Sequence, residues 1–155
     1  MTPAAEGVTF VVPVLNGART VKRALSSIVA QRDARPFEII AIDDGSIDGS
    51  LRVLSRLQRE GTLRLIHGDR RGAAAAINAG IREATHAIIC QIDQDVILQP
   101  GWLARILEGF GKRPIRIRRG ASAYSPLRVD AIRKAQNRER VIHTDDHFRP
   151  DATVH

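Results

Sequence analysis

Three short polar segments carry the residues whose types and spacing could do chemistry. They are Asn16-Gly17, Asp43-Asp44-Gly45-Ser46 and Asp93-Gln94-Asp95. Neighbouring carboxylates repel each other, so Asp93 and Asp95 together are unfavourable unless a cation or strong hydrogen-bond donors compensate. On an extended segment these two side chains can point the same way. The pair therefore predicts a Mg²⁺ or Mn²⁺ site that ligand phosphates and water would complete.

Each of these segments follows an apolar run of the kind found in strands buried on both faces. We expect strands near 8–15, 37–42, 63–66 and 87–92, the first ending about Pro13 because proline cannot donate to a ladder. Helical spacing of apolar residues is found between them, at 19–31, from a cap at Ser46 or Asp48 to Gly61, at 73–84 and at 100–110. This alternation predicts an α/β fold, a three-layer α/β/α sandwich with a mainly parallel sheet.

The position of the polar segments is informative because open parallel sheets bind ligands beyond the carboxyl ends of their strands. We expect Asp43 and Asp93 along one edge of the sheet. Any single pair of this kind can also be a turn followed by a helix cap. Three such strand ends in one sheet favour a ligand site.

Composition restricts the class of protein. The chain has 155 residues, of which 43% are hydrophobic and 26% charged, as expected of one globular domain. A single cysteine, Cys90, excludes a disulfide framework and a cysteine-rich zinc site. No apolar run approaches the ~20 residues of a membrane span, and the N-terminus has no signal-peptide pattern, so we expect a cytoplasmic protein.

The formal net charge of +7 suggests an anionic partner: nucleic acid, phosphate groups or acidic lipid. Ten basic residues lie in 112–140, opposed only by Asp130 and Glu139. Tyr124 is the only aromatic residue among them, so stacking platforms are lacking and no nucleic-acid partner is expected. The sequence also lacks a Gly-x-Gly-x-x-Gly fingerprint and a Walker-type phosphate loop, which disfavours dinucleotide enzymes and Walker NTPases.

Four segments in order resemble family 2 glycosyltransferases with the GT-A fold, a likeness that covers 8–110. The first two are Val-Val-Pro-Val-Leu-Asn-Gly at 11–17 and Ile-Ile-Ala-Ile-Asp-Asp-Gly-Ser-Ile-Asp-Gly at 39–49. The others are Gly-Ala-Ala-Ala-Ala-Ile-Asn-Ala-Gly at 72–80 and the Asp-x-Asp motif at 93–95, with Pro-Gly-Trp-Leu at 100–103. One departure is Leu15, where the family often has tyrosine or phenylalanine.

The resemblance implies a hexosyltransferase-like enzyme that moves a sugar from a nucleotide-diphosphate sugar, commonly a uridine one, to a carbohydrate or lipid-linked acceptor. Asp93 and Asp95 would ligate the metal, which bridges the two phosphates. Arg71, Asn78 and Gly80 would shape the pocket near the nucleotide, although Arg71 and Asn78 are equally well explained as a solvated charge and a cap. The implied nucleotide-sugar contacts are Pro13, Val14, Leu15, Asn16, Asp43, Asp44, Arg71, Asn78 and Asp93.

The segment 111–155 resembles a shortened acceptor half within one domain, 1–155. Thr144-Asp145-Asp146 looks like the family's acidic pair, so Asp145 or Asp146 would be the general base of an inverting transfer. His143, His147 and His155 lie nearby and either complete the metal site or belong to a polar tail. The basic 112–140 segment would contact an anionic membrane peripherally. The alternative is a nucleotide-sugar-binding module or an inactive remnant without a complete acceptor site.

Overall fold

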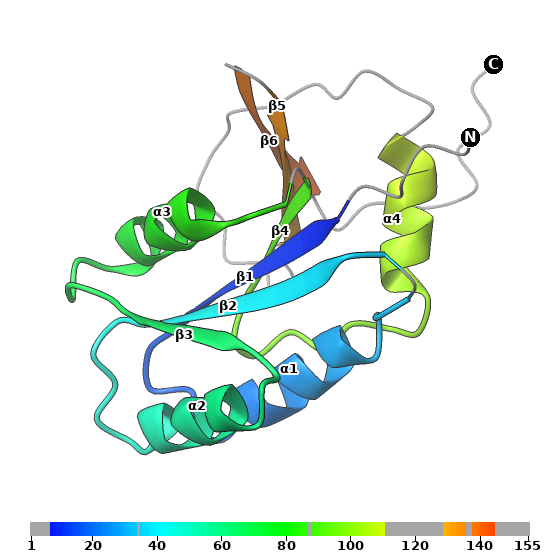
Figure 1. The fold of residues 1–155 in the computed structure, drawn as a ribbon. Helices are drawn as coiled ribbons and strands as arrows, with labels where there is room; N and C mark the ends of the chain where they lie inside the picture. Colours follow the sequence, from blue (N-terminus) through cyan, green and yellow to red (C-terminus); the bar gives the residue numbers. More distant parts are fainter. Residues whose placement is uncertain (1–6, 34, 87, 111–128, 136–137, 145–155) are drawn as a thin grey trace, which may run out of the picture.

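The computed structural model describes residues 7–33, 35–86, 88–110, 129–135 and 138–144. Strands and helices alternate through the first 110 residues, and two strands follow (Figure 1). The expected α/β fold is confirmed, and each expected strand boundary lies within one residue of the observed one. The elements are β1 (Val8–Val14), α1 (Val21–Val29), β2 (Phe37–Asp43), α2 (Ser50–Arg59), β3 (Arg64–His67), α3 (Ala73–Glu83), β4 (Ile88–Ile92), α4 (Trp102–Phe110), β5 (Val129–Ala135) and β6 (Arg138–Thr144).

In the described part of the chain the strands form one six-stranded sheet in the order β3-β2-β1-β4-β5-β6. β3, β2, β1 and β4 are parallel, whereas β5 runs antiparallel to β4 and β6 antiparallel to β5. The chain moves outward from β1 through β2 to β3 and then returns to the other side of β1 to form β4. The direction of winding therefore reverses between β1 and β4, which is the switch point where such sheets bind ligands.

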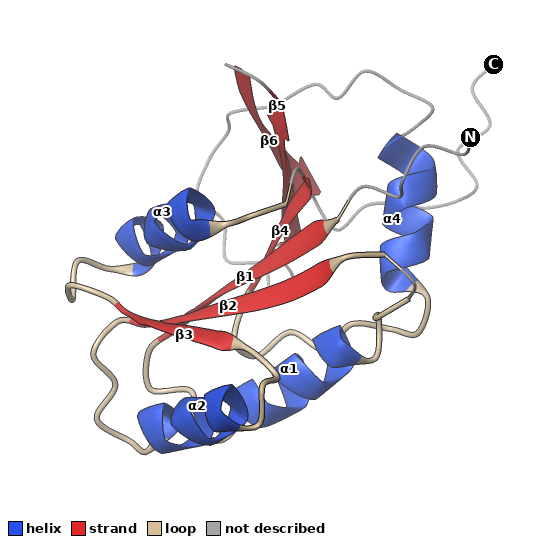
Figure 2. Ribbon diagram, in the orientation of Figure 1, coloured by secondary structure: helices blue, strands red, loops and turns tan. Residues whose placement is uncertain are grey.

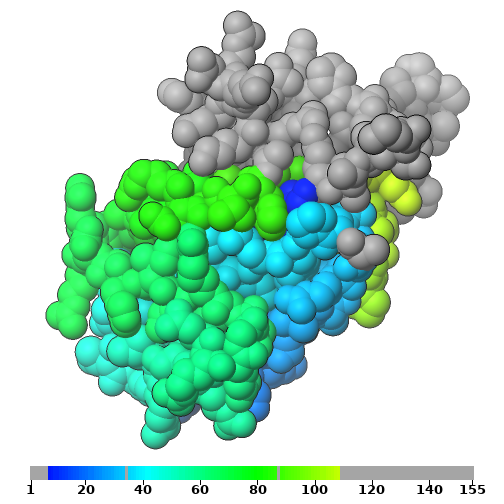
Figure 3. All heavy atoms as spheres, in the orientation of Figure 1, coloured from blue at the N-terminus to red at the C-terminus, as the bar shows by residue number. Residues whose placement is uncertain are grey.

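Helices cover both faces of the sheet (Figure 2). One face packs against α1, α2 and α4, through a core that includes Phe10, Leu25, Leu54 and Leu103. The other face packs against α3, through a smaller core that includes Val11, Ile40 and Ala76. Figure 3 shows the green residues of α3 lying directly against light-blue residues of the sheet. The three-layer arrangement predicted from the sequence is confirmed.

β1 and β4 separate before β1 ends. β1 pairs with β2 along its full length, from Val8 to Val14, but its pairing with β4 ends at Val11, opposite Gln91. The Val14 carbonyl accepts the N–H of Asp44 on the β2 side, so the backbone groups of Pro13, the next residue back, face β4. Proline has no N–H to offer there. β1 can therefore continue past Pro13 to Val14, one residue beyond its expected end, while a gap opens on its β4 side.

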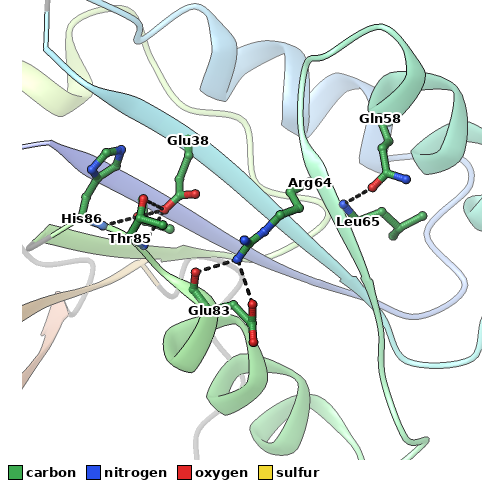
Figure 4. A network of polar contacts seen from close by, with 8 residues as sticks. Glu38, Gln58, Arg64, Leu65, Glu83, Thr85 and His86 are labelled. Carbon is green, nitrogen blue, oxygen red and sulfur yellow. Dashed lines mark hydrogen bonds and ion pairs between the residues drawn. The ribbon is translucent and has the colours of Figure 1, made fainter.

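The opposite, amino end of the sheet is held by a polar network (Figure 4). Glu38 on β2 accepts hydrogen bonds from the Thr9 hydroxyl at 2.6 Å and from the N–H and hydroxyl of Thr85, each at 2.7 Å. Arg64 on β3 donates to the carbonyl and carboxylate of Glu83 at the end of α3. These bonds fasten β1, β2, β3 and the α3–β4 connection together, away from the carboxyl end.

Two local expectations differ from the structure. Neither Ser46 nor Asp48 caps α2: its N-cap is Gly49 in a left-handed conformation, with φ 103°. Asp48 instead accepts the N–H and hydroxyl of Ser50, the first helical residue. The hairpin of β5 and β6 was not expected from the sequence, and it extends the sheet beyond β4.

Candidate active site

A cavity of about 240 Å³ lies at the switch point. Its walls come from the ends of three strands and from the first turn of α3. Because β1 and β4 have separated there, the cavity occupies the gap that follows their last backbone pair. The lining residues are Pro13, Val14, Leu15, Asp44, Ala73, Ala76, Asp93, Gln94 and Asp95.

Asp43 and Asp44 end β2 as two adjacent buried carboxylates, 3% and 6% exposed. Asp43 accepts the N–H of Ser46 in the following turn, and Asp44 accepts the N–H of Gly72 at 2.8 Å. Among the described residues, one oxygen of each carboxylate is buried with no hydrogen-bond partner. A buried acceptor without a donor is unfavourable by about 1–3 kcal/mol. A ligand whose N–H or O–H groups donate to these oxygens would therefore gain binding free energy. Only Asp44 of the pair lines the cavity.

The Asp-x-Asp segment is oriented by buried neighbours. Gln91, 2% exposed on β4, donates to Asp93 at 2.7 Å, and the Asp93 carbonyl accepts the N–H of Val96 in a turn. Asp95 is exposed and reaches the cavity from the other side of Gln94. No group of three histidine, cysteine or acidic side chains within metal distance occurs in the described ranges. Two carboxylates facing an open cavity fit Mg²⁺ or Mn²⁺, which proteins hold with one or two carboxylates, ligand phosphates and water.

The β1–α1 loop cannot serve as a phosphate-binding loop, because its backbone donors are occupied. Four consecutive N–H groups each donate to a side chain from another segment: Leu15 to Gln94, Asn16 to Ser46, Gly17 to Ser50 and Ala18 to Asp48, at 2.8–3.0 Å. The Asn16 side chain in turn accepts the N–H of Ile47 at 2.9 Å, and Asn16 does not line the cavity. Anionic groups in the cavity must therefore be balanced by something other than this loop.

Gln94 is the lining residue whose role the sequence did not suggest. Its carboxamide oxygen accepts the N–H of Leu15 and its amide nitrogen donates to the carbonyl of Leu15, each at 2.9 Å. Gln91 was missed in the same way. A glutamine next to aspartates has no spacing rule of its own, so only the geometry reveals these contacts.

Arg71 and Asn78 lie at a second cavity of about 190 Å³ and do not line the first. The second cavity adjoins the first at Ala76 and is also lined by His67, Asp69 and Arg82. Contact of Arg71 and Asn78 with a nucleotide therefore stays a prediction. Gly80 faces the sheet, where a Cβ atom would overlap the side chains of Val11 and Ile42, so it does not shape a pocket.

Asp145 and Asp146, predicted as the catalytic pair, lie outside the described residues. Cys90 is in the core, and burial raises the pKa of its thiol to about 12, so it cannot act as a thiolate nucleophile.

Comparison with known proteins decides the family. The sequence model of glycosyl transferase family 2 matches residues 9–153. The chain belongs to this family. An uncharacterized glycosyltransferase of Nostoc is 33% identical over 105 residues, which are 66% of this chain and 32% of that protein. The chain spans about a third or less of the length of the curated relatives it matches.

Solved structures support the GT-A fold. The mannosyltransferase PcManGT from Pyrobaculum calidifontis, in complex with GDP-Man and Mn²⁺, superposes with a TM-score of 0.61 and 25% identity, over 73% of this chain and 36% of that one. The glucosyl-3-phosphoglycerate synthase of Mycobacterium tuberculosis, with Mn²⁺, UDP and glucosyl-3-phosphoglycerate, gives 0.57 and 22%, over 68% and 40%. Within the described residues of our chain, no helix has the length and apolarity to cross a membrane.

Proposed function

We propose that this chain is the donor-binding part of a glycosyltransferase that takes a sugar from a nucleotide-diphosphate sugar, with uridine as the base. The observation that carries the proposal is the convergence of Asp44, Asp93 and Asp95 on one cavity at the switch point. One structural neighbour is in complex with the nucleotide sugar GDP-Man and Mn²⁺, and another is in complex with UDP and Mn²⁺, which supports the proposal.

The β2 side of the cavity would bind the nucleoside. The unpartnered carboxylate oxygen of Asp44, which lines the cavity, is an acceptor that base N–H or ribose hydroxyl groups can satisfy, and contact with the adjacent Asp43 remains a prediction. Pro13, Val14 and Leu15 provide an apolar wall beside them.

The β4 side would take the diphosphate. Asp93 and Asp95 would hold a Mg²⁺ or Mn²⁺ ion, which when bound neutralises negative charge on the leaving diphosphate. The engaged amides of residues 15–18 support this assignment, because that loop has no free donors for the phosphates. The first turn of α3 has no capping side chain and faces the cavity through Ala73, which adds a weak positive potential.

Transfer itself would be an inverting displacement. A carboxylate at Asp145 or Asp146 would accept the proton of the acceptor hydroxyl as that oxygen attacks the sugar carbon. The match of the family model through residue 153 supports this assignment. The acceptor would be a carbohydrate or lipid-linked hydroxyl, and flotation with anionic vesicles would test peripheral membrane contact through 112–140.

A thermal-shift panel of nucleotide sugars, with and without Mn²⁺, tests the donor assignment. A ligand at ~100 times its dissociation constant adds about 2.7 kcal/mol of stability, which such a panel detects. We expect a UDP-sugar with Mn²⁺ to raise the melting temperature more than the same sugar with a chelator. No shift with any nucleotide sugar would contradict the proposal.

Product analysis then tests the reaction. Incubation with the stabilising donor and a set of acceptors should release nucleoside diphosphate and form a glycoside of inverted anomeric configuration. Donor binding without transfer to any acceptor would instead support an inactive binding module.

A further inference from the structure

We propose that Gln94 is a positioning residue that fixes the width of the donor cavity by holding the end of β1 to the Asp-x-Asp turn. The inference rests on the proposed function, since it concerns how the two walls of that site are held at a fixed distance from each other. It also gives the middle residue of this Asp-x-Asp segment a role separate from the carboxylates on either side.

The Gln94 side chain bonds to the backbone of Leu15 in the way that a neighbouring strand would. Odd-numbered residues of β1 direct their backbone groups toward β4, and Val11 is the last to pair with the β4 backbone. Two residues later Pro13 offers no N–H, and two residues after that the N–H and carbonyl of Leu15 both bond to the Gln94 carboxamide. The carboxamide therefore resumes the ladder after a gap, and the cavity lies at the gap.

The walls that Gln94 joins belong to different halves of the proposed site. Leu15 continues the wall of Pro13 and Val14, which would contact the base. Gln94 itself lies between Asp93 and Asp95, which would hold the metal. Asp93 is fixed independently by Gln91, so loss of the Gln94 contacts would release the β1 end and leave Asp93 in place.

Gly17 makes room for this contact. A Cβ atom there would overlap the oxygen and carbon of the Gln94 carboxamide. The backbone of Gly17 does not have the positive φ that alanine would resist, so Gly17→Ala should displace the Gln94 side chain without straining the loop. It provides a second variant that leaves the glutamine and both aspartates intact.

The test separates ligands that span the cavity from ligands that use one wall. UDP with Mn²⁺ spans both walls, whereas uridine alone and Mn²⁺ alone each use one. Affinities of the full chain for the three are measured by calorimetry and, for Mn²⁺ alone, by paramagnetic resonance. For Gln94→Leu and for Gly17→Ala we expect UDP with Mn²⁺ to bind at least about tenfold more weakly, because misplacement by about 1 Å can cost a hundredfold. Uridine alone and Mn²⁺ alone should bind within about twofold of the parent, as expected when only the coupling between sites is lost.

Gln58→Leu is the matched control. Gln58 also bonds a backbone group of a strand, accepting the N–H of Leu65 at 2.7 Å, but on the β3 edge. Its loss should leave the ratio of the three affinities unchanged. If Gln94→Leu does not fold, Gly17→Ala decides alone.

Two results would overturn the inference. Equal binding of UDP with Mn²⁺ by the parent and the cavity variants would show that Gln94 does not set the spacing, and equal weakening of all three ligands would show a merely structural role. A parent chain that binds neither UDP nor Mn²⁺ would instead overturn the proposed function, and this inference with it.

Discussion

The carboxylates at the carboxyl end of the sheet differ in burial and in the hydrogen bonds that they already accept from the protein. Asp48 is exposed and accepts hydrogen bonds from Ser50 and from the N–H of Ala18. These hydrogen bonds hold the pKa of Asp48 below its usual value. Asp44 is buried with one oxygen engaged and one unpartnered. Asp95 is exposed at the cavity. Residue type alone does not distinguish these roles, but surroundings do.

Substitution of Asp95 tests the metal assignment. Asp95→Ala should abolish the extra stabilisation that Mn²⁺ gives to a nucleoside diphosphate complex, because one of two metal-binding carboxylates is lost. The ligand-free stability should change by no more than about 0.5 kcal/mol, since the residue is exposed. Thermal shifts with and without Mn²⁺ measure both. Asp33→Asn, at an exposed carboxylate paired with Arg35 before β2, is the control and should keep the full metal effect. A full metal effect in Asp95→Ala would reject the assignment.

Leu15 offers a gain-of-affinity test. Its side chain is 49% exposed at the cavity wall, and both of its backbone groups are held by Gln94. Leu15→Tyr should present an aromatic face on an unchanged backbone and tighten uridine binding by about five- to tenfold, at the lower end of the ~1–3 kcal/mol per base that stacking on an aromatic ring contributes. Calorimetry with uridine measures the change. Ile47→Tyr, on the neighbouring loop outside the cavity lining, should have no effect, and a similar gain there would contradict base contact at Leu15.

At the scale of helices and strands, the two ends of the sheet are built differently. The amino end is joined by side-chain hydrogen bonds of Glu38 and Arg64, which connect strands to one another, to the end of α3 and to the α3–β4 connection. The carboxyl end is joined by side chains that hold loops, and it keeps a cavity between β1 and β4. Stability and ligand binding therefore depend on different residues and can be perturbed separately.

The network at the amino end should make stability depend on pH through Glu38. Partial burial alone would raise the pKa of Glu38, but hydrogen bonds from Thr9 and Thr85, with a contribution from His86, outweigh it and hold the pKa below the ordinary value of 4.5. A lowered carboxyl pKa contributes stability that is present above 4.5 and is lost as the pH falls through the folded-state pKa.

Glu38→Gln should therefore reduce the free energy of unfolding at pH 7 by about 1 kcal/mol, the scale of one charge-assisted bond partly screened by solvent. The difference from the parent should shrink as the pH falls below 4.5. Urea titrations at several pH values measure it. A difference that is the same at every pH would show that the charge of Glu38 does not stabilise the fold.

Close packing of α3 on the sheet depends on Gly80, which lies against Val11 and Ile42. Gly80→Val should lower the free energy of unfolding by about 2–3 kcal/mol, because overpacking there outweighs any gain in helix propensity. Ala74→Val, at an exposed position of the same helix, is the matched control and should change stability by less than about 1 kcal/mol. Chemical denaturation compares the two. Equal effects would mean that α3 does not depend on a close approach at residue 80.

The sequence predicted the elements whose apolar pattern is continuous and missed those whose pattern is mixed. Runs such as Val8–Val14 and Ile88–Ile92 have few polar residues because both of their faces are buried. β5 reads Val-Asp-Ala-Ile-Arg-Lys-Ala, with charges interspersed, and has no such signal. In the site, aspartates at strand ends could be located from the alternation, whereas the contacts of Gln91 and Gln94 depend on rotamers and on a gap between strands. The family resemblance implies that Arg71 and Asn78 lie near the nucleotide, but the sequence does not predict that they line a second cavity beside the first.

On the scale of the whole molecule, the strands before residue 111 and the strands after residue 128 belong to one sheet. β5 pairs with β4 from Ile88↔Arg133 to Ile92↔Val129, and β6 pairs with β5. The family model likewise spans 9–153 without interruption. The division into a donor half, 8–110, and an acceptor half, 111–155, is therefore a proposal about function within a continuous sheet.

The transfer activity should depend on the acceptor half, 111–155. Asp145→Asn combined with Asp146→Asn should leave nucleotide affinity nearly unchanged and reduce transfer at least about a hundredfold, because a positioned base contributes ~10²–10⁴ in rate. Donor binding by calorimetry and product formation with the best acceptor measure the two effects. Unchanged turnover would place the base elsewhere.

The four occupied amides of residues 15–18 have a practical consequence for engineering. Their partners come from other segments of the chain, so the path of the loop is determined mainly by Ser46, Asp48, Ser50 and Gln94, together with the Asn16 side chain, which accepts the N–H of Ile47. A library randomised at Leu15 would vary the chemistry of an exposed position of the cavity wall on a constant backbone. Randomising the four partners would instead alter the shape of the cavity wall, so donor selectivity is best sought at Leu15.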